Sequence, residues 1–179
     1  MNNFTAINTP TETEALVAFF DLTAFAKSVK NDSSHEVFDF LSDYYELVGE
    51  MIESAGGTII KFIGDAGLVV FPSSKVNEGV IALKKVKDQG DAWLSQRNRA
   101  SKTVVKIHYG PVTCGPLGTR TEKRLDIIGV TVNTAALLHS KGYAMSAQVF
   151  RKLNPDTRKL FKKHTLPITY IPVEARHQD

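Results

Sequence analysis

Residues 58–71 read TIIKFIGDAGLVVF, in which two apolar runs flank the pair Gly64–Asp65. Short runs of β-branched and aromatic residues on either side of a glycine-containing turn predict a β-hairpin. The first run contains a lysine, Lys61, four residues before the acid Asp65. A cation inside so apolar a strand needs a physical explanation.

Side chains alternate between the two faces of a strand. The predicted faces are Ile59, Lys61 and Ile63 on one side and Thr58, Ile60 and Phe62 on the other. Because both faces are largely apolar, we expect both to be covered, one by helices and the other by a second layer such as a partner chain. Lys61 then needs a buried acceptor. The alternative is an edge strand whose lysine reaches solvent.

The bulk composition is that of one globular domain. The chain has 179 residues, of which 42% are hydrophobic and 23% charged. The net charge is +3, and the basic residues form no long run, so we predict no nucleic-acid binding. Cys114 is the only cysteine, so no intrachain disulfide can form.

The first residues are polar, and we predict a flexible lead-in over 1–14 and a single domain over 15–179. The start has neither a basic segment nor an apolar segment typical of a signal peptide. No apolar stretch reaches transmembrane length. We therefore expect a cytoplasmic protein with no membrane insertion.

The hydrophobic spacing predicts the remaining elements. Strands are expected at 15–22, 103–110, 124–129 and 168–173, and helices at 34–55, 76–97, 131–142 and, as one or two short pieces, 146–161. The stretch 111–118 is expected to be a strand or a turn. The order β-α-β-β-α-β predicts an α+β fold, a ferredoxin-like split βαβ sheet with helices on one face.

Two acids are placed to meet. Asp21 ends the first predicted strand, and Asp65 lies at the hairpin tip. If the hairpin pairs with that strand, the two carboxylates converge and repel each other unless a cation lies between them. Mg²⁺ takes oxygen ligands and binds phosphates through one or two carboxylates. The following TAFAKS predicts a helix start, which suits a phosphate. The alternative roles for the acids are helix capping and turn formation.

Four stretches in this order resemble the class III nucleotidyl cyclase catalytic domain, which includes adenylyl and guanylyl cyclases. They are FFDLTAF, GGTIIKFIGDAGLVVF, YGPVTCGPLGTR and RLDIIGVTVNTAALL. The resemblance runs from about residue 15 to about residue 173. Four ordered motifs are far more specific than any one of them.

The resemblance implies a metal site. Asp21 and Asp65 match the two metal-binding aspartates, with two Mg²⁺ or Mn²⁺ ions per site. The backbone of Leu22 would also reach a metal, and the backbone of Leu22, Thr23, Ala24 and Phe25 would hold the triphosphate.

The resemblance also implies how the base and ribose are held. Lys61 and Asp126 match the two purine-reading positions, where this pair accompanies adenine. Asn133 matches the asparagine that orients the ribose. Arg120 resembles a phosphate-contacting arginine, and Lys162, with Lys163 as a competitor, a lysine on the terminal phosphates.

In the family, the metal aspartates come from one subunit, and the base-reading pair and the asparagine come from the other. The resemblance therefore implies a head-to-tail homodimer with two sites at the interface and a nucleoside triphosphate, most readily ATP, as substrate. The product would be a 3′,5′-cyclic nucleotide with release of pyrophosphate.

The sequence departs from the family pattern on the helix of Asn133. An arginine usually follows the asparagine by four residues and stabilises charge on the transferring phosphate, but here the residue is Leu137. Lys141, one predicted turn further, is a possible substitute. Ala24 and Ala26 stand where glycine and threonine are common.

Three functional hypotheses remain open. The retained site residues favour an active adenylyl cyclase. The second hypothesis is a cyclase for another base, GTP or a pyrimidine triphosphate, as in bacterial defence cyclases. Leu137 favours the third, a catalytically silent nucleotide-binding module.

Overall fold

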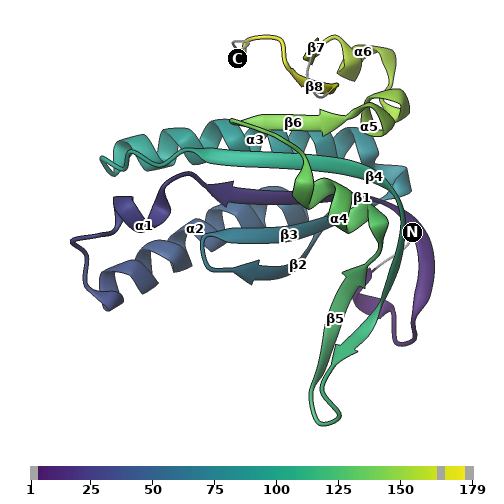
Figure 1. Cartoon of the computed structure of the whole chain (residues 1–179), viewed down its shortest axis with the longest axis horizontal. Helices are drawn as coiled ribbons and strands as arrows, with labels where there is room; N and C mark the ends of the chain where they lie inside the picture. Colours follow the sequence, from purple (N-terminus) through teal and green to yellow (C-terminus); the bar gives the residue numbers. More distant parts are fainter. Residues whose placement is uncertain (1–3, 165–167, 176–179) are drawn as a thin grey trace.

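The computed structural model describes residues 4–164 and 168–175. Its strands form one mixed sheet in the order β2-β3-β1-β4-β6-β8-β7, and β5 pairs with β4 outside this row (Figure 1). The strands are β1 (Thr11–Leu22), β2 (Thr58–Ile63), β3 (Ala66–Pro72), β4 (Thr103–Gly118), β5 (Lys123–Ile128), β6 (Tyr143–Ser146), β7 (Phe161–His164) and β8 (Thr169–Pro172).

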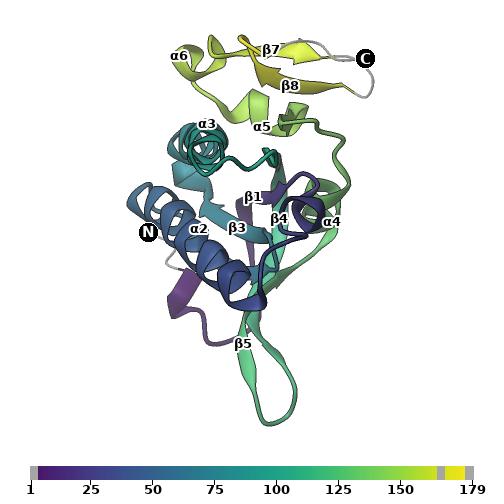
Figure 2. The same ribbon diagram turned by 90° about the vertical axis from the view of Figure 1, so that its left-hand side faces the viewer.

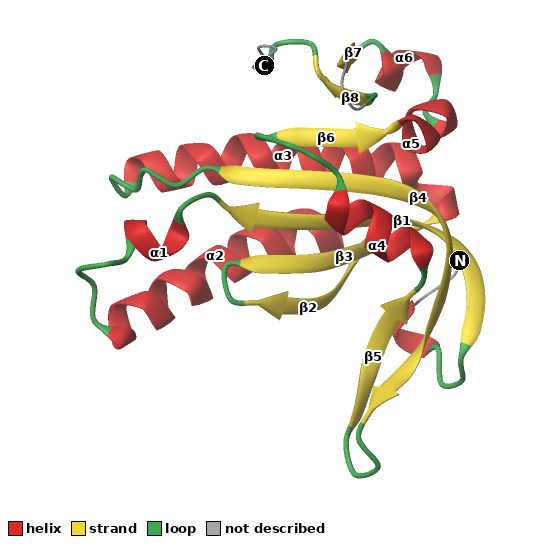
Figure 3. Ribbon diagram, in the orientation of Figure 1, coloured by secondary structure: helices red, strands yellow, loops and turns green. Residues whose placement is uncertain are grey.

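The helices are α1 (Phe25–Ser28), α2 (Ser34–Ser54), α3 (Val76–Gln96), α4 (Val130–Leu137), α5 (Ala147–Lys152) and α6 (Pro155–Arg158) (Figure 3). Two short 3₁₀ turns, η1 (Phe4–Ala6) and η2 (Ser73–Lys75), complete the described elements. No helix in this part of the chain is long and apolar enough to cross a lipid bilayer.

The α+β fold predicted from the sequence is confirmed. The two long helices, α2 and α3, cover one face of the sheet, whereas the short α4 lies on the opposite face (Figure 2). In β1, Leu16 and Phe20 belong to the core under the long helices, and Ala15 and Val17 to a second core with Ala135 of α4. Both faces of β1 are therefore buried.

The start of the first strand differs from the prediction. β1 begins at Thr11, so residues 11–14 of the predicted lead-in pair with β4, from Thr11 opposite Cys114 to Glu14 opposite Pro111. Hydrophobic spacing could not predict this pairing, because the first four residues of the strand are polar and are held by backbone hydrogen bonds rather than by burial of their side chains. Phe4 is also fully buried in the second core.

Helix α2 is set by its ends and its spacing. The Ser33 hydroxyl accepts from the Glu36 N–H at 3.2 Å, and the Glu36 carboxylate accepts from the Ser33 N–H at 2.7 Å, which completes a capping box. Its buried residues recur every fourth position: Phe40, Tyr44, Val48 and Ile52. Gly56, at φ 81°, follows its last turn.

The predicted alternation along β2 is wrong after Ile59. Ile59 pairs with Val69 but Lys61 pairs with Leu68, so Ile60 is an extra residue in a β-bulge. As a result, Ile59 and Phe62 both pack on the core under α2, and Ile60 packs on the opposite face. Sequence alternation assumes a regular strand and cannot detect an inserted residue.

The C-terminal part contains strands that the sequence did not predict. Helix α4 ends at Leu137 and not near Gly142, because the chain turns to lay β6 parallel to β4, with Val105 opposite Tyr143. The Val105 N–H donates to the Gly142 carbonyl at 2.6 Å at this turn. β6 and β7 are four residues each, too short for periodicity to reveal.

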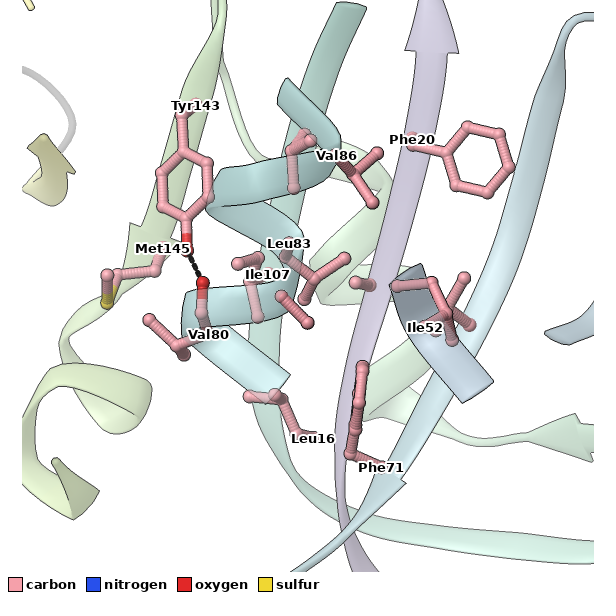
Figure 4. Close-up of a cluster of buried hydrophobic side chains, with 14 of the residues drawn as sticks. Leu16, Phe20, Ile52, Phe71, Val80, Leu83, Val86, Ile107, Tyr143 and Met145 are labelled. Carbon is pink, nitrogen blue, oxygen red and sulfur yellow. Dashed lines mark hydrogen bonds between the residues drawn. The ribbon is translucent and has the colours of Figure 1, made fainter. Parts of the chain in front are cut away.

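The core under the long helices joins β6 to α3. Figure 4 shows Leu16, Phe71, Leu83 and Ile107 filling the space between β1, β3, β4 and α3. The buried Tyr143 hydroxyl donates to the Val80 carbonyl at 3.0 Å. This hydrogen bond satisfies a hydroxyl that would otherwise be costly to bury.

Gly67 is required where β3 pairs with β1 beside the ring of Phe20. It lies opposite Phe20, and a Cβ at this position would lie 2.3 Å from the Phe20 ring. The missing side chain lets the ring sit over β3, next to the turn that carries Asp65.

We expect Gly67→Ala to lower the free energy of unfolding by about 1–3 kcal/mol, because the added methyl group overpacks the ring of Phe20. Gly49→Ala is the matched control. Gly49 lies inside α2, where a Cβ would be 3.9 Å from its nearest neighbour, so this variant should gain about 0.5–1 kcal/mol from helix propensity. Urea denaturation measures the free energy of unfolding of both variants. Changes of the same sign in the two variants would contradict the role of Gly67.

Candidate active site

Two carboxylates meet at one edge of the sheet. Phe20 pairs with Gly67 and Ile63 pairs with Ala66, which brings Asp21, just after Phe20, beside the β2–β3 turn that holds Asp65. Partial burial raises the pKa of Asp65, and the negative charge of Asp21 raises it further. Asp21 Oδ1 accepts from the Leu22 N–H at 2.9 Å. The predicted convergence is present.

The turn that carries Asp65 is fastened to α2. The Tyr45 hydroxyl donates to the Gly64 carbonyl, and its ring stacks on Phe62 with centroids 3.7 Å apart. Burial raises the pKa of Tyr45, and so does the charge of Asp65. The sequence analysis predicted only a helix over 34–55 and gave no sign of this contact.

The carboxylate pair suits a divalent cation with few protein ligands. Among the described residues no cluster of three or more His, Cys, Asp or Glu side chains could hold a metal. Two carboxylates supply hard oxygen donors, and their mutual repulsion falls when a cation binds between them. Mg²⁺ and Mn²⁺ fit this donor set, with phosphate and water oxygens as the remaining ligands.

Lys61 lies on an edge strand and is exposed, as the alternative prediction had it, so the expectation that both faces of this strand are covered is wrong within one chain. It nevertheless has a carboxylate as its acceptor. Its ammonium donates to Asp126 Oδ2 of β5 at 2.5 Å, and the two side chains are 44% and 20% exposed. Asp126 Oδ1 also accepts from the Ile127 N–H at 2.8 Å, which fixes the carboxylate. The bulge at Ile60 turns Lys61 toward β5, so the ion pair presents one donor and one acceptor side by side.

The predicted phosphate turn is strained. Ala24 adopts a left-handed conformation, φ 50° and ψ 32°, at the start of α1. Its neighbour Thr23 is bound to the residue just before β4: the Thr23 N–H donates to the Lys102 carbonyl at 2.8 Å, and the Thr23 hydroxyl accepts from the Lys102 N–H at 2.9 Å. The Thr23 N–H is thus already engaged, which removes one donor from the predicted triphosphate cradle.

Helix α4 presents Asn133 on an open face. Asn133 is exposed, and Val130 and Leu137, on the same side of the helix, are 80% and 84% exposed. The prediction that Lys141 lies one turn further along the same helix and could replace the arginine is wrong, because α4 ends at Leu137 and Lys141 lies in the loop that follows.

Two predicted phosphate contacts lie apart from the carboxylates. Arg120 is in the turn between β4 and β5, a hairpin that projects from the body of the molecule (Figure 1). Lys162 lies on β7 opposite Ile171, and Lys163 opposite Tyr170. A cavity of about 280 Å³ between α3, the loop after α4 and β8 is lined by Lys141 but by none of the other predicted site residues.

These arrangements match a known family. The model of the adenylate and guanylate cyclase catalytic domain matches residues 7–171. The chain belongs to this family. The prediction of a class III nucleotidyl cyclase domain from the four sequence motifs is confirmed.

Relatives include both kinds of cyclase. An adenylate cyclase of Anabaena cylindrica is 28% identical over 67% of this chain and 26% of its own length. The receptor-type guanylate cyclase Gyc76C of Drosophila melanogaster is 29% identical over 80% of this chain and 10% of its own length. The chain therefore spans about a tenth to a quarter of these relatives.

A solved structure shows the same fold. It is the non-canonical dimeric guanylyl cyclase domain of a RhoGC fusion protein from the fungus Blastocladiella emersonii. It superimposes with a TM-score of 0.78 at 19% identity, over 91% of this chain and 98% of that one.

We expect Ala24→Gly to stabilise the protein by about 0.5–1 kcal/mol, because glycine adopts the left-handed conformation without the steric cost that a Cβ adds. Ala26→Gly, two residues away inside α1, should instead destabilise it by a similar amount. Thermal unfolding of both variants decides the point. A loss of stability in Ala24→Gly would show that the turn is not strained.

Proposed function

We propose that this chain converts a nucleoside triphosphate, preferably ATP, into a 3′,5′-cyclic nucleotide and pyrophosphate. The observation that carries the proposal is the Lys61–Asp126 pair, because it offers a donor and an acceptor 2.5 Å apart. Adenine presents the complementary groups, a ring nitrogen that accepts and a 6-amino group that donates. Guanine presents an acceptor and a donor in the opposite order along its edge, so the two bases are distinguishable.

The remaining predicted residues have roles consistent with this chemistry. Asp21 and Asp65 would bind the divalent cations, and Asn133 would hydrogen-bond the ribose and hold its 3′-hydroxyl for in-line attack on the α-phosphate. When bound, the cations would lower the pKa of that hydroxyl and neutralise charge on the phosphates. Lys162 and Arg120 remain proposed contacts to the terminal phosphates.

A homodimer would complete the site. Several large apolar residues that neighbour the site residues in sequence are more than half exposed, namely Ile63, Ile128, Val130 and Leu137. Such exposure is typical of a surface that another chain covers. We propose that a second copy covers it, so that Asp21 and Asp65 of one protomer act with Lys61, Asp126 and Asn133 of the other.

A second candidate function rests on Leu137. An exposed leucine at the position of the family's arginine supplies no charge to the transferring phosphate. Loss of one transition-state donor costs about 10²–10³ in rate. A nucleotide-binding module without turnover is therefore the competing proposal.

The deciding experiment incubates the purified protein with Mn²⁺ and ATP, GTP, CTP or UTP and identifies the products by mass. We expect cyclic AMP. Asp65→Ala and Asn133→Ala should each abolish turnover, and an equal mixture should recover about a quarter of it, since half of random dimers are mixed and each has one intact site. Another cyclic nucleotide would overturn the base assignment, and binding without product would favour the silent module.

We expect Lys61→Glu to lower the ratio of kcat/KM for ATP to that for GTP about tenfold or more, because the second carboxylate repels the ring nitrogen of adenine and accepts from guanine. Lys61→Met is the control for simple loss of the cation, and it should lower kcat/KM for both ATP and GTP. An unchanged ratio in Lys61→Glu would remove the purine-reading role from Lys61.

A further inference from the structure

The exposed face of α4 lacks the cation that the proposed reaction needs. Leu137 is apolar and 84% exposed, and the helix ends there. A group that replaces the arginine must therefore come from another element and reach the same phosphate, which in the proposed dimer lies beside Asp21 of the other chain.

Lys106 of β4 lies on the correct face. Its neighbours Val105 and Ile107 pack in the core under α2 and α3, so Lys106 points to the opposite face, where α4 lies. Its ammonium donates to the Ala136 carbonyl at 3.1 Å, one residue before Leu137. The cation is thus held at the C-terminal end of α4.

Lys106 is also close to the carboxylate edge. It pairs with Phe19 across β1 and β4, and Asp21 pairs with Val104 two residues away. Asp21 and Lys106 are therefore diagonal neighbours on one face, a relation in which backbones lie about 7–8 Å apart and long side chains can meet. This backbone spacing would let the Lys106 side chain extend toward a phosphate bound beside Asp21.

The charge of Lys106 is not neutralised by a carboxylate. Among the described residues its one hydrogen-bond partner is the neutral Ala136 carbonyl, and it forms no ion pair. By contrast, Lys61 and Lys87 each bind an aspartate at 2.5 Å. An ammonium has three donors, so two remain for oxygens of a ligand. An uncompensated cation on this face favours a polyanion there.

We propose that Lys106 is a catalytic residue that binds the transferring phosphate beside Asp21 of its own protomer, in place of the arginine missing at Leu137. This rests on the proposed function. The ammonium donates to a non-bridging phosphate oxygen and stabilises the negative charge that grows in the transition state. Lys106 acts by hydrogen bonding and charge alone, and it forms and breaks no covalent bond.

The competing explanation is structural. A lysine near the last carbonyls of a helix stabilises the helix C-terminus. In that case Lys106 would serve α4, and through it Asn133 of its own chain. The two roles assign Lys106 to opposite sites of the proposed dimer, which makes them separable.

The test places Lys106→Met on one chain of a mixed dimer. Asp65→Ala and Asn133→Ala chains together form one intact site, in which the Asn133→Ala chain supplies Asp21. Lys106→Met on that chain should lower kcat about 10²-fold. On the Asp65→Ala chain it should have almost no effect. The reverse result, or no loss in either position, overturns the proposal.

A rescue and a binding measurement strengthen the design. Leu137→Arg on the Asp65→Ala chain should restore about tenfold or more of the lost turnover, because it returns a cation to the same phosphate. In the homodimer, Lys106→Met should weaken binding of an ATP analogue with a methylene bridge between the α- and β-phosphates about tenfold, whereas Lys85→Met, on the helix side of the sheet, should not.

The binding measurement separates this inference from the proposed function. A wild-type protein that binds the analogue but forms no product would contradict the cyclase activity alone. Unchanged analogue affinity in Lys106→Met would overturn the role of Lys106 even in an active enzyme.

Discussion

The structure depends on a strand that is apolar on both faces. Residues 15–18 of β1 are fully buried, and alternate side chains enter different cores. Burial of both faces requires two covering layers. Helices α2 and α3 provide one, and α4 provides the other together with Phe4 and β5. Beside this second layer, Ile63 and Ile128 remain more than half exposed near Asp65 and Asp126, which leaves a surface for the proposed ligand and second chain.

Much of this was predictable from local pattern. The hairpin 58–72, the two long helices and the meeting of Asp21 with Asp65 follow from periodicity, turn residues and strand order. Other features depend on tertiary pairing, which no short window contains. The bulge at Ile60 and the four-residue strand β6 exist because neighbouring strands select them. The early end of α4 has the same cause, because the residues that follow it must turn to form β6 beside β4.

Lys61 and Lys106 are both lysines inside apolar strands, but the sequence predicts a site role only for Lys61. The hairpin motif surrounds Lys61, and the family resemblance identifies its partner, Asp126. Lys106 stands in an equally apolar strand, VVKIHYG, and carries the same signal. Without a motif around it, only the geometry distinguishes it, through the carbonyl it reaches and the acid diagonal to it. A charged residue in a buried strand therefore merits the same question wherever it occurs.

The contact between Tyr45 and the β2–β3 turn has a mechanical meaning. One aromatic ring joins α2 to the backbone beside Asp65, by stacking on Phe62 and by bonding to the Gly64 carbonyl. Tyr45 lies near the middle of the 21-residue helix, so the contact couples the centre of α2 to this turn. We therefore expect a displacement of α2 to shift the Gly64 carbonyl and, with it, the neighbouring Asp65.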